Sequence, residues 1–279
     1  RPIRWLLALK GVDLIPVEIP GADPPVRSDR FSRGHRLHGD QPLPIDTAEA
    51  YDDTLAAAGV IVDRQQRAAL IRSQLDASAD QLNGLPDCPE SLFEELVDLV
   101  ESPRLLQGSI AERFLSLPPE VIITVMQAHQ RYVPLKVPEV TPDPLQLEAM
   151  GVLQRDFLLV GNGLEAADAL ITRGNERVLA ARLADAEFFL SVDRRQPSSV
   201  RREALDRVTF AEGLGTLLDR CQRIERTARQ LVDQLNLDAH QGEAAIRAAH
   251  FCKHDLVSQM VGEFPELQGL MGGYFSEHQ

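Results

Sequence analysis

Apolar and polar residues change their spacing along the chain, from short runs in the first half to a helical period in the second. Apolar runs at residues 3–9 and 14–19, joined by a short turn with a glycine, predict a β-hairpin. Residues 21–46 are rich in Gly, Pro, Asp and Arg, which predicts a long loop or an irregular stretch. Apolar positions at helical spacing then predict three helices, at residues 47–58, 60–82 and 89–101.

The middle of the chain predicts one helix and two strands. The segment from Pro118 to His129 favours a helix over a strand, because proline is common in the first turn of a helix. Residues 130–135 and 157–160 are apolar runs, and we expect them to form paired strands. The segment between them, residues 134–148, contains four prolines and predicts a mobile hairpin tip.

Beyond residue 172 the strand signals vanish and the helical period dominates, with a further helix expected at residues 243–261. The predicted fold class is therefore α+β. We expect an α+β domain over residues 1–172 and an all-helical domain over residues 173–279. No internal repeat is visible between the two halves.

Composition excludes several classes of protein. The longest apolar run, Leu55 to Val62, is far shorter than the roughly 18 residues of a membrane span, so the sequence predicts no membrane partner. A net charge of −13 argues against wholesale coating by nucleic acid but leaves room for a local basic face. Three widely spaced cysteines indicate a reducing cytoplasm rather than a disulfide scaffold. Because the sequence shows no signal-peptide pattern and its first residue is Arg1 rather than Met, we expect a fragment or a processed product.

Two basic stretches in the first domain are candidates for contact with RNA. The stretch 27–36 carries four arginines with a glycine, and arginine binds phosphates through two parallel hydrogen bonds. The alternative is a solvated loop whose arginines pair with nearby acids. Residues 129–132 read His-Gln-Arg-Tyr, which suits an RNA-binding surface or an ordinary edge strand. The predicted RNA-binding residues here are Arg30, Arg33, His35, Arg36, His129 and Arg131.

Two further basic stretches lie in the helical part. Residues 173–189 are more polar than a packing helix needs, which indicates either an RNA contact or a docking helix between domains. A second cluster of arginines spans residues 194–207. The predicted RNA-binding residues here are Arg177, Arg182, Arg194 and Arg195.

His250 and His254 are four residues apart, a spacing at which two histidines on one helical face can bind a metal ion. Asp255 completes a His-Asp doublet of the kind that metal-dependent phosphohydrolases carry. Such a site also needs an upstream His and a distal Asp, and packing or capping roles are the alternative. The sequence has no phosphate-binding loop, dinucleotide fingerprint or nucleophile elbow, so we predict no catalytic residue and no resident metal.

Several of these stretches together resemble the beta subunit of the bacterial heterotetrameric glycyl-tRNA synthetase. The matching segments keep the family order and cover nearly all of the chain: residues 1–9, 33–36, 119–124, 129–132, 174–179, 182–189, 253–257 and 260–269. The family's beta chain is considerably longer, so the resemblance implies a central fragment. The family usually has Ala where this chain has His254, which implies that the His-Asp doublet is coincidental.

The resemblance implies an α+β domain similar to the editing-type domain of the phenylalanyl-tRNA synthetase beta chain, followed by a degenerate HD-like helical domain. It implies no cofactor in this chain, with ATP and Mg on the class II alpha subunit. The implied partners are the acceptor arm of tRNA(Gly) and the alpha subunit, in a cytoplasmic holoenzyme of two alpha and two beta chains. The alternatives are an HD-type phosphohydrolase and a purely structural docking fragment of the synthetase.

Overall fold

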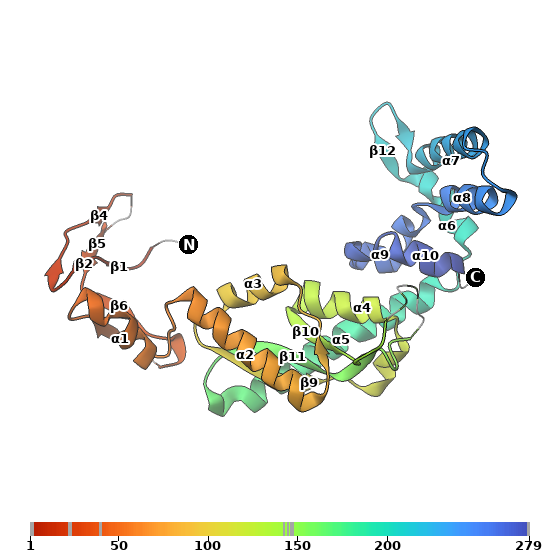
Figure 1. The fold of residues 1–279 in the computed structure, drawn as a ribbon. Helices are drawn as coiled ribbons and strands as arrows, with labels where there is room; N and C mark the ends of the chain where they lie inside the picture. The colour runs from red at the N-terminus through yellow and green to blue at the C-terminus, as the bar shows by residue number, and fades with distance from the viewer. Residues whose placement is uncertain are drawn as a thin grey trace. The chain divides into compact units, whose positions relative to one another are not determined.

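The computed structural model describes residues 3–21, 24–38, 41–141, 143, 145 and 148–277 (Figure 1). The chain forms two compact units, each made of two segments: unit 1 of residues 1–108 and 158–174, unit 2 of residues 109–157 and 175–279. Strand β9 (Pro103–Ser109), strand β11 (Leu153–Asn162) and helix α5 (Asp168–Asp193) each contribute to both units. The mixture of helices and strands confirms the α+β class, whereas a domain boundary at residue 172 stays a prediction.

The first part of unit 1 consists of short strands. The expected hairpin is confirmed by strands β2 and β3, which pair antiparallel across a turn where Gly11 has a φ of 58°. The long loop or irregular stretch expected over residues 21–46 is wrong where β5, β6 and β7 form, and the described prolines and glycines of this range lie between strands and at their ends. Pro42 and Pro44 both belong to β7, a strand paired on one side only, where a missing N–H is tolerated. The strands are β1 (Leu6–Leu7), β2 (Leu9–Lys10), β3 (Asp13–Leu14), β4 (Glu18–Ile19), β5 (Val26–Asp29), β6 (Phe31–Arg33) and β7 (Pro42–Pro44).

The three helices expected next are confirmed: α1 (Tyr51–Ala57), α2 (Arg64–Leu82) and α3 (Glu90–Leu99). Helix α2 begins where the Asp63 carboxylate accepts the N–H of Gln65 at 2.7 Å, and it ends at Asn83 in the left-handed region. Helix α3 buries Phe93, Leu96 and Val97 on one face, as its apolar spacing requires.

A four-stranded sheet has the order β8-β10-β11-β9, with β8 (Leu85–Pro86) at one edge. The two strands expected around residues 130–135 and 157–160 are confirmed as neighbours, β10 (Tyr132–Lys136) and β11. The helix expected before them is also confirmed, as α4 (Pro119–Thr124) followed by a π-helical turn at Val125–Gln130. Of the expected mobile tip, residues 142, 144, 146 and 147 lie outside the described residues.

The rest of unit 2 is mainly helical, but it contains a small hairpin of β12 and β13. The expectation that strands vanish after residue 172 is therefore wrong. Gly213 and Gly215, with φ of 75° and 81°, make this tight turn possible. The elements are α6 (Ser198–Ala204), β12 (Thr209–Ala211), β13 (Gly215–Thr216), α7 (Leu217–Gln234), α8 (Ala239–Phe251), α9 (Gln259–Glu263) and α10 (Leu270–Glu277).

The single helix expected at residues 243–261 is wrong, because α8 ends at Phe251 and α9 starts at Gln259. The carbonyl of His250 accepts a hydrogen bond from Arg202, and that of Cys252 accepts one from the Cys221 thiol. Lys253 then adopts the left-handed region with φ of 72°, which breaks the helix.

The buried carboxylate of Asp193, at the end of α5, accepts the first two N–H groups of α9. Its two oxygens lie 3.0 Å from the nitrogen of Gln259 and 2.9 Å from that of Met260. This contact joins two parts of unit 2 that are far apart in sequence. Among the described residues, no helix is long and apolar enough to cross a membrane.

Candidate nucleic-acid interface

Two adjoining cavities lie beside helix α8 in unit 2. One has a volume of about 530 Å³ and the other about 410 Å³, and both are lined by Arg247, Phe251 and Ser276. Lys253 and Asp255 also line the first cavity, and Arg194 and Arg195 line the second. We call the two cavities together the basic groove. In the part of the chain that the structure describes, its walls carry four cations: Arg194, Arg195, Arg247 and Lys253.

The local sequence explains why these side chains meet. The Asp238 carboxylate accepts the N–H of Gln241 at 2.8 Å and so starts helix α8. Ala244, Arg247 and Phe251 then follow at spacings of three and four residues, which places all three on one face of the helix. Arg194 and Arg195 follow directly after α5 and line the smaller cavity together with Arg247 and Phe251.

Three of the four cations are available to a ligand. Within the described residues, the side chains of Arg195, Arg247 and Lys253 make no ion pair or hydrogen bond, whereas Arg194 donates to the Tyr274 hydroxyl. The half-buried ring of Phe251 lies edge-on to the rings of His250 and His254, with centroids 4.8 Å and 5.8 Å away. Cations beside an aromatic ring suit a ligand that combines phosphates with a stacking base.

Buried polar groups lie behind the groove. One Asp255 oxygen accepts the N–H groups of Gly269 at 2.5 Å and Gly272 at 3.1 Å, and the other has no hydrogen-bond partner among the described residues. The Nδ1 of His254 lies 2.6 Å from the Phe251 carbonyl, which requires Nδ1 to donate. Burial lowers the pKa of His254, and the bond to Phe251 only partly opposes this. His254 is therefore neutral at pH 7.

A fully buried arginine, Arg201, shares this interior. Its guanidinium donates to the carbonyls of Asp193 at 2.8 Å and Gln196 at 2.5 Å and stacks 4.1 Å from the ring centre of Phe275. Burial lowers the pKa of Arg201, and the charges of Asp193 and Asp255 act in the opposite direction. A cation in this position disfavours a metal ion beside Asp255.

The three metal-site candidates do not form one ligand set. The expectation that His250 and His254 share a helical face is wrong, because α8 ends between them and His254 belongs to a separate 3₁₀ turn. The Nδ1 of His250 instead lies 2.9 Å from Glu225. Over the residues that the structure describes, no three His, Cys, Asp or Glu side chains are arranged to hold a metal ion.

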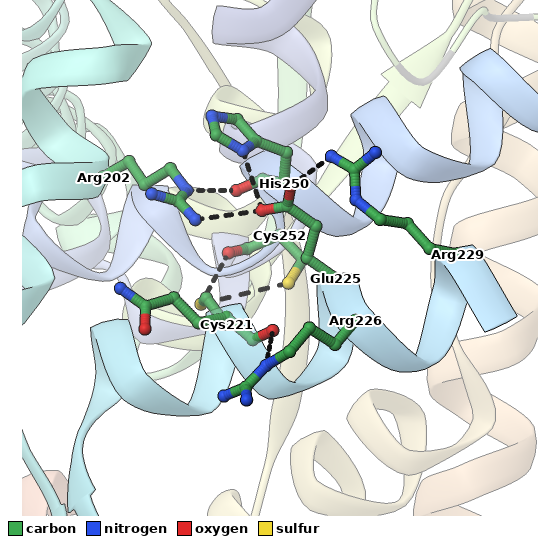
Figure 2. Close-up of polar contacts among 8 residues, drawn as sticks. Arg202, Cys221, Glu225, Arg226, Arg229, His250 and Cys252 are labelled. Atoms are coloured by element: carbon green, nitrogen blue, oxygen red, sulfur yellow. Dashed lines mark hydrogen bonds and ion pairs between the residues drawn. The ribbon is translucent and has the colours of Figure 1, made fainter.

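Figure 2 shows the polar cluster that joins helices α6, α7 and α8. The carboxylate of Glu225 lies 2.7 Å from Arg229, 2.9 Å from His250 and 3.1 Å from Arg202. The hydrogen bonds from Arg229 and then His250 lower the pKa of Glu225 below its usual value. The cluster fixes the α8 helix that carries Arg247 and Phe251.

Of the four residues predicted in unit 1, only Arg36 is exposed and makes no side-chain ion pair or hydrogen bond in the described part of the chain. Arg30 donates to the carbonyls of Val12 and Asp46, and Arg33 lies 5.8 Å from the ring centre of Trp5. His35 is 1% exposed, and its Nε2 lies 3.0 Å from the side-chain oxygen of Asn162. The ring of His35 therefore serves the fold of unit 1.

The predicted residues in unit 2 outside the groove differ in the same way. His129 lies 3.5 Å from a carboxylate oxygen of Glu266, and Arg131, with φ of 60°, donates to the Ala128 carbonyl. Arg182 forms an ion pair of 3.1 Å with Glu263. Arg177 is exposed on α5, and its side chain makes no ion pair or hydrogen bond within the described ranges.

The sequence-based prediction missed Arg247 and Lys253. The signal for them was weak: one arginine in an alanine-rich helix, at the spacing of Ala244 and Phe251, and a lysine two residues beyond Phe251. It also passed over the arginines of α7, although they recur at every third residue. These are engaged within unit 2, as they contact Phe210, the carbonyls of Leu214 and Gln222, and Glu225: Arg220, Arg223, Arg226 and Arg229.

Comparison with known proteins identifies the class to which this α+β chain belongs. The family model described as glycyl-tRNA synthetase beta subunit matches residues 1–279. The glycine–tRNA ligase beta subunit of Gloeothece citriformis is 42% identical over 98% of this chain and 37% of its own length. Those of Moorella thermoacetica and Chromohalobacter salexigens are 42% and 40% identical, over 100% and 99% of this chain.

These matches place the chain among the subunits of aminoacyl-tRNA ligases. It belongs to the glycyl-tRNA synthetase beta subunit family. The chain spans about 38% of the length of the relatives it matches.

Proposed function

We propose that these residues form a tRNA-binding part of a glycine–tRNA ligase, which recognises and positions tRNA(Gly) for ATP-dependent glycylation by an alpha subunit. The observation that carries the proposal is the basic groove. In a chain with net charge −13, three cations that make no ion pair or hydrogen bond within the described ranges gather beside the half-buried aromatic ring of Phe251. Such a surface attracts a polyanion locally while the rest of the protein repels it.

The dimensions of the groove suit single-stranded RNA better than a duplex. Each cavity falls within the range of roughly 300–1,000 Å³ that pockets for small ligands occupy. A nucleotide with its base against Phe251 would bring its phosphates toward Arg247 and Lys253. Arg195 would then meet a neighbouring phosphate in the second cavity. The free 3′ end of the acceptor arm is the single-stranded segment of tRNA nearest the site of aminoacylation.

The family membership supports the remaining parts of the proposal. We place ATP, Mg and glycine on the alpha subunit and assign no catalytic residue to this chain. The holoenzyme would contain two alpha and two beta chains in the cytoplasm. We further propose that the helices after residue 173 form a non-hydrolytic HD-like domain, and that the preceding α+β domain is similar to the editing-type domain of the phenylalanyl-tRNA synthetase beta chain.

The proposal is tested by the salt dependence of tRNA binding. The variant combines Arg195→Ala, Arg247→Ala and Lys253→Ala in the intact ligase, and binding of tRNA(Gly) and a non-cognate tRNA is measured by anisotropy at several salt concentrations. The slope of log K against log salt is negative, and removal of three phosphate contacts reduces its magnitude by about 2 to 3. The family's ligase would still bind glycine and ATP normally.

The matched control removes the same charge elsewhere, through Arg27→Ala, Arg64→Ala and Arg72→Ala. These exposed arginines are already paired with Glu18, Asp98 and Glu90, so we expect an unchanged slope. Equal slopes for the wild type and the groove variant would contradict the proposal. Such a result would favour a structural docking role for these residues.

A further inference from the structure

Two of the three cysteines lie together, although they are far apart in sequence. The sulfurs of Cys221, on α7, and Cys252, directly after α8, are 4.0 Å apart (Figure 2). Both are free thiols. We propose that this pair is a redox modification site, which a peroxide converts to a disulfide and a dithiol reductant restores. This inference is independent of RNA binding.

The two cysteines have different environments, which sets the order of the steps. Cys252 is half-buried and lines the larger cavity of the basic groove, so a molecule as small as hydrogen peroxide can reach it. Cys221 is fully buried, and its thiol donates to the Cys252 carbonyl at 3.2 Å. Burial raises the pKa of Cys221 to about 11, so this thiol stays protonated at neutral pH.

The chemistry follows from this difference. The Cys252 sulfur attacks one oxygen of the peroxide, the O–O bond breaks, and a sulfenic acid and one water form. The Cys221 thiol then gives up its proton as its sulfur attacks the Cys252 sulfur, the S–O bond breaks, and the leaving hydroxyl takes up that proton and departs as a second water. Two thiols are oxidised to one disulfide while one peroxide is reduced to two waters.

The backbone allows the sulfurs to close the gap. A disulfide requires about 2.05 Å between sulfurs, so the pair must approach by roughly 2 Å. Cys252 lies outside the regular helix, and Lys253 follows in the left-handed region, so rotation of the Cys252 side chain does not disturb an α-helical turn. The disulfide would cross-link α7 to the end of α8. Since Cys252 lines the larger cavity, the disulfide would also tie one wall of the basic groove to α7.

The test is peptide mapping of the intact ligase after brief exposure to hydrogen peroxide. Free thiols are alkylated before digestion with trypsin, which releases residues 221–223 and residues 248–253 as separate peptides. We expect these two peptides to be recovered linked, and to separate again after treatment with dithiothreitol. Recovery of both peptides alkylated, or of oxidised Cys252 without the link, would overturn the proposal.

Variants assign the link to this pair. Cys252→Ser abolishes it and leaves Cys221 reduced, whereas Cys88→Ser, which removes a thiol in unit 1, leaves it intact. The Cys221→Ser variant alters a buried position. Its peptide map is therefore interpreted only if its circular dichroism spectrum matches that of the wild type. A link from Cys221 to any other cysteine in the wild-type ligase would also refute the assignment.

Discussion

Replacement of Glu225 by glutamine isolates the charge at the centre of the polar cluster that joins α6, α7 and α8. The side chain keeps its shape, but the carboxylate that accepts from Arg202, His250 and Arg229 becomes a neutral amide. The side chains of Glu225 and Arg202 are only 17% and 13% exposed, so water replaces little of the lost interaction. Arg202 is left with a nearly buried charge that has lost its counterion.

The magnitude follows from the three hydrogen bonds. A hydrogen bond to a charged group contributes roughly 1.5–3 kcal/mol, and a hydrogen bond between neutral groups contributes roughly 0.5–1.5 kcal/mol. The bonds from Arg202 and His250 to residue 225 therefore each lose about 1 kcal/mol. Arg229 is 55% exposed and adds at most about 0.5 kcal/mol. We expect Glu225→Gln to lower the free energy of unfolding by about 2–3 kcal/mol at pH 7.

The effect also has a defined pH dependence. The folded pKa of Glu225 is lowered below its unfolded value of about 4.3, so its charge stabilises the fold fully above that pH. This stabilisation is lost as the pH falls through the folded pKa. The difference between wild type and Glu225→Gln therefore shrinks as the pH falls through the folded pKa of Glu225.

Urea denaturation followed by far-UV circular dichroism measures both effects. The matched control is Arg229→Ala, which removes only the exposed partner and should cost no more than about 0.5 kcal/mol. The reasoning is refuted if Glu225→Gln costs no more than this control. A wild-type to variant difference that persists unchanged at low pH would refute it as well.

Two further predictions concern unit 1 and helix α5. Asn162→Ala removes the oxygen that accepts the N–H groups of Glu101 and Ser102 and faces His35, and it should lower the free energy of unfolding of unit 1 by about 2–3 kcal/mol in urea denaturation. A loss below about 0.5 kcal/mol would show that water replaces these bonds. Gly174→Ala, where an added Cβ meets no atom within 4 Å, should stabilise α5 by about 0.5–1 kcal/mol and raise the melting temperature. An unchanged or lower melting temperature would contradict that expectation.

Local patterns in the sequence predicted most of the helices and two of the four cations that line the basic groove. Arg194 and Arg195 were found because two adjacent arginines stand out in an acidic chain. Arg247 was missed because it is isolated in an alanine-rich segment, and only folding brings it to the wall that Arg194 and Arg195 share. A local sequence pattern cannot show that two residues about 50 positions apart lie close together in the folded chain.

The pattern of charges also gave no indication of which polar side chains are buried. His35 lies within a run of arginines and so resembles a surface residue, yet its ring points to Asn162, 127 residues further along the chain. Similarly, the spacing of His250 and His254 indicates one helical face only if the helix continues. The helix ends where Lys253 adopts the left-handed region, and distant side chains, those of Arg202 and Cys221, bond to the carbonyls just before it.

The bond between Asp193 and the start of α9 imposes a delay on folding of the protein during its synthesis. Its acceptor precedes its donors by 66 and 67 residues. At roughly 5–20 residues per second, a ribosome needs about 3–13 s to add that length. During this interval the end of α5 is complete, but its carboxylate lacks the two N–H groups that it accepts in the folded unit. Cotranslational folding of unit 2 therefore cannot finish until residues 259 and 260 emerge from the exit tunnel, and a ribosome stalled earlier would hold a nascent chain with that interior open.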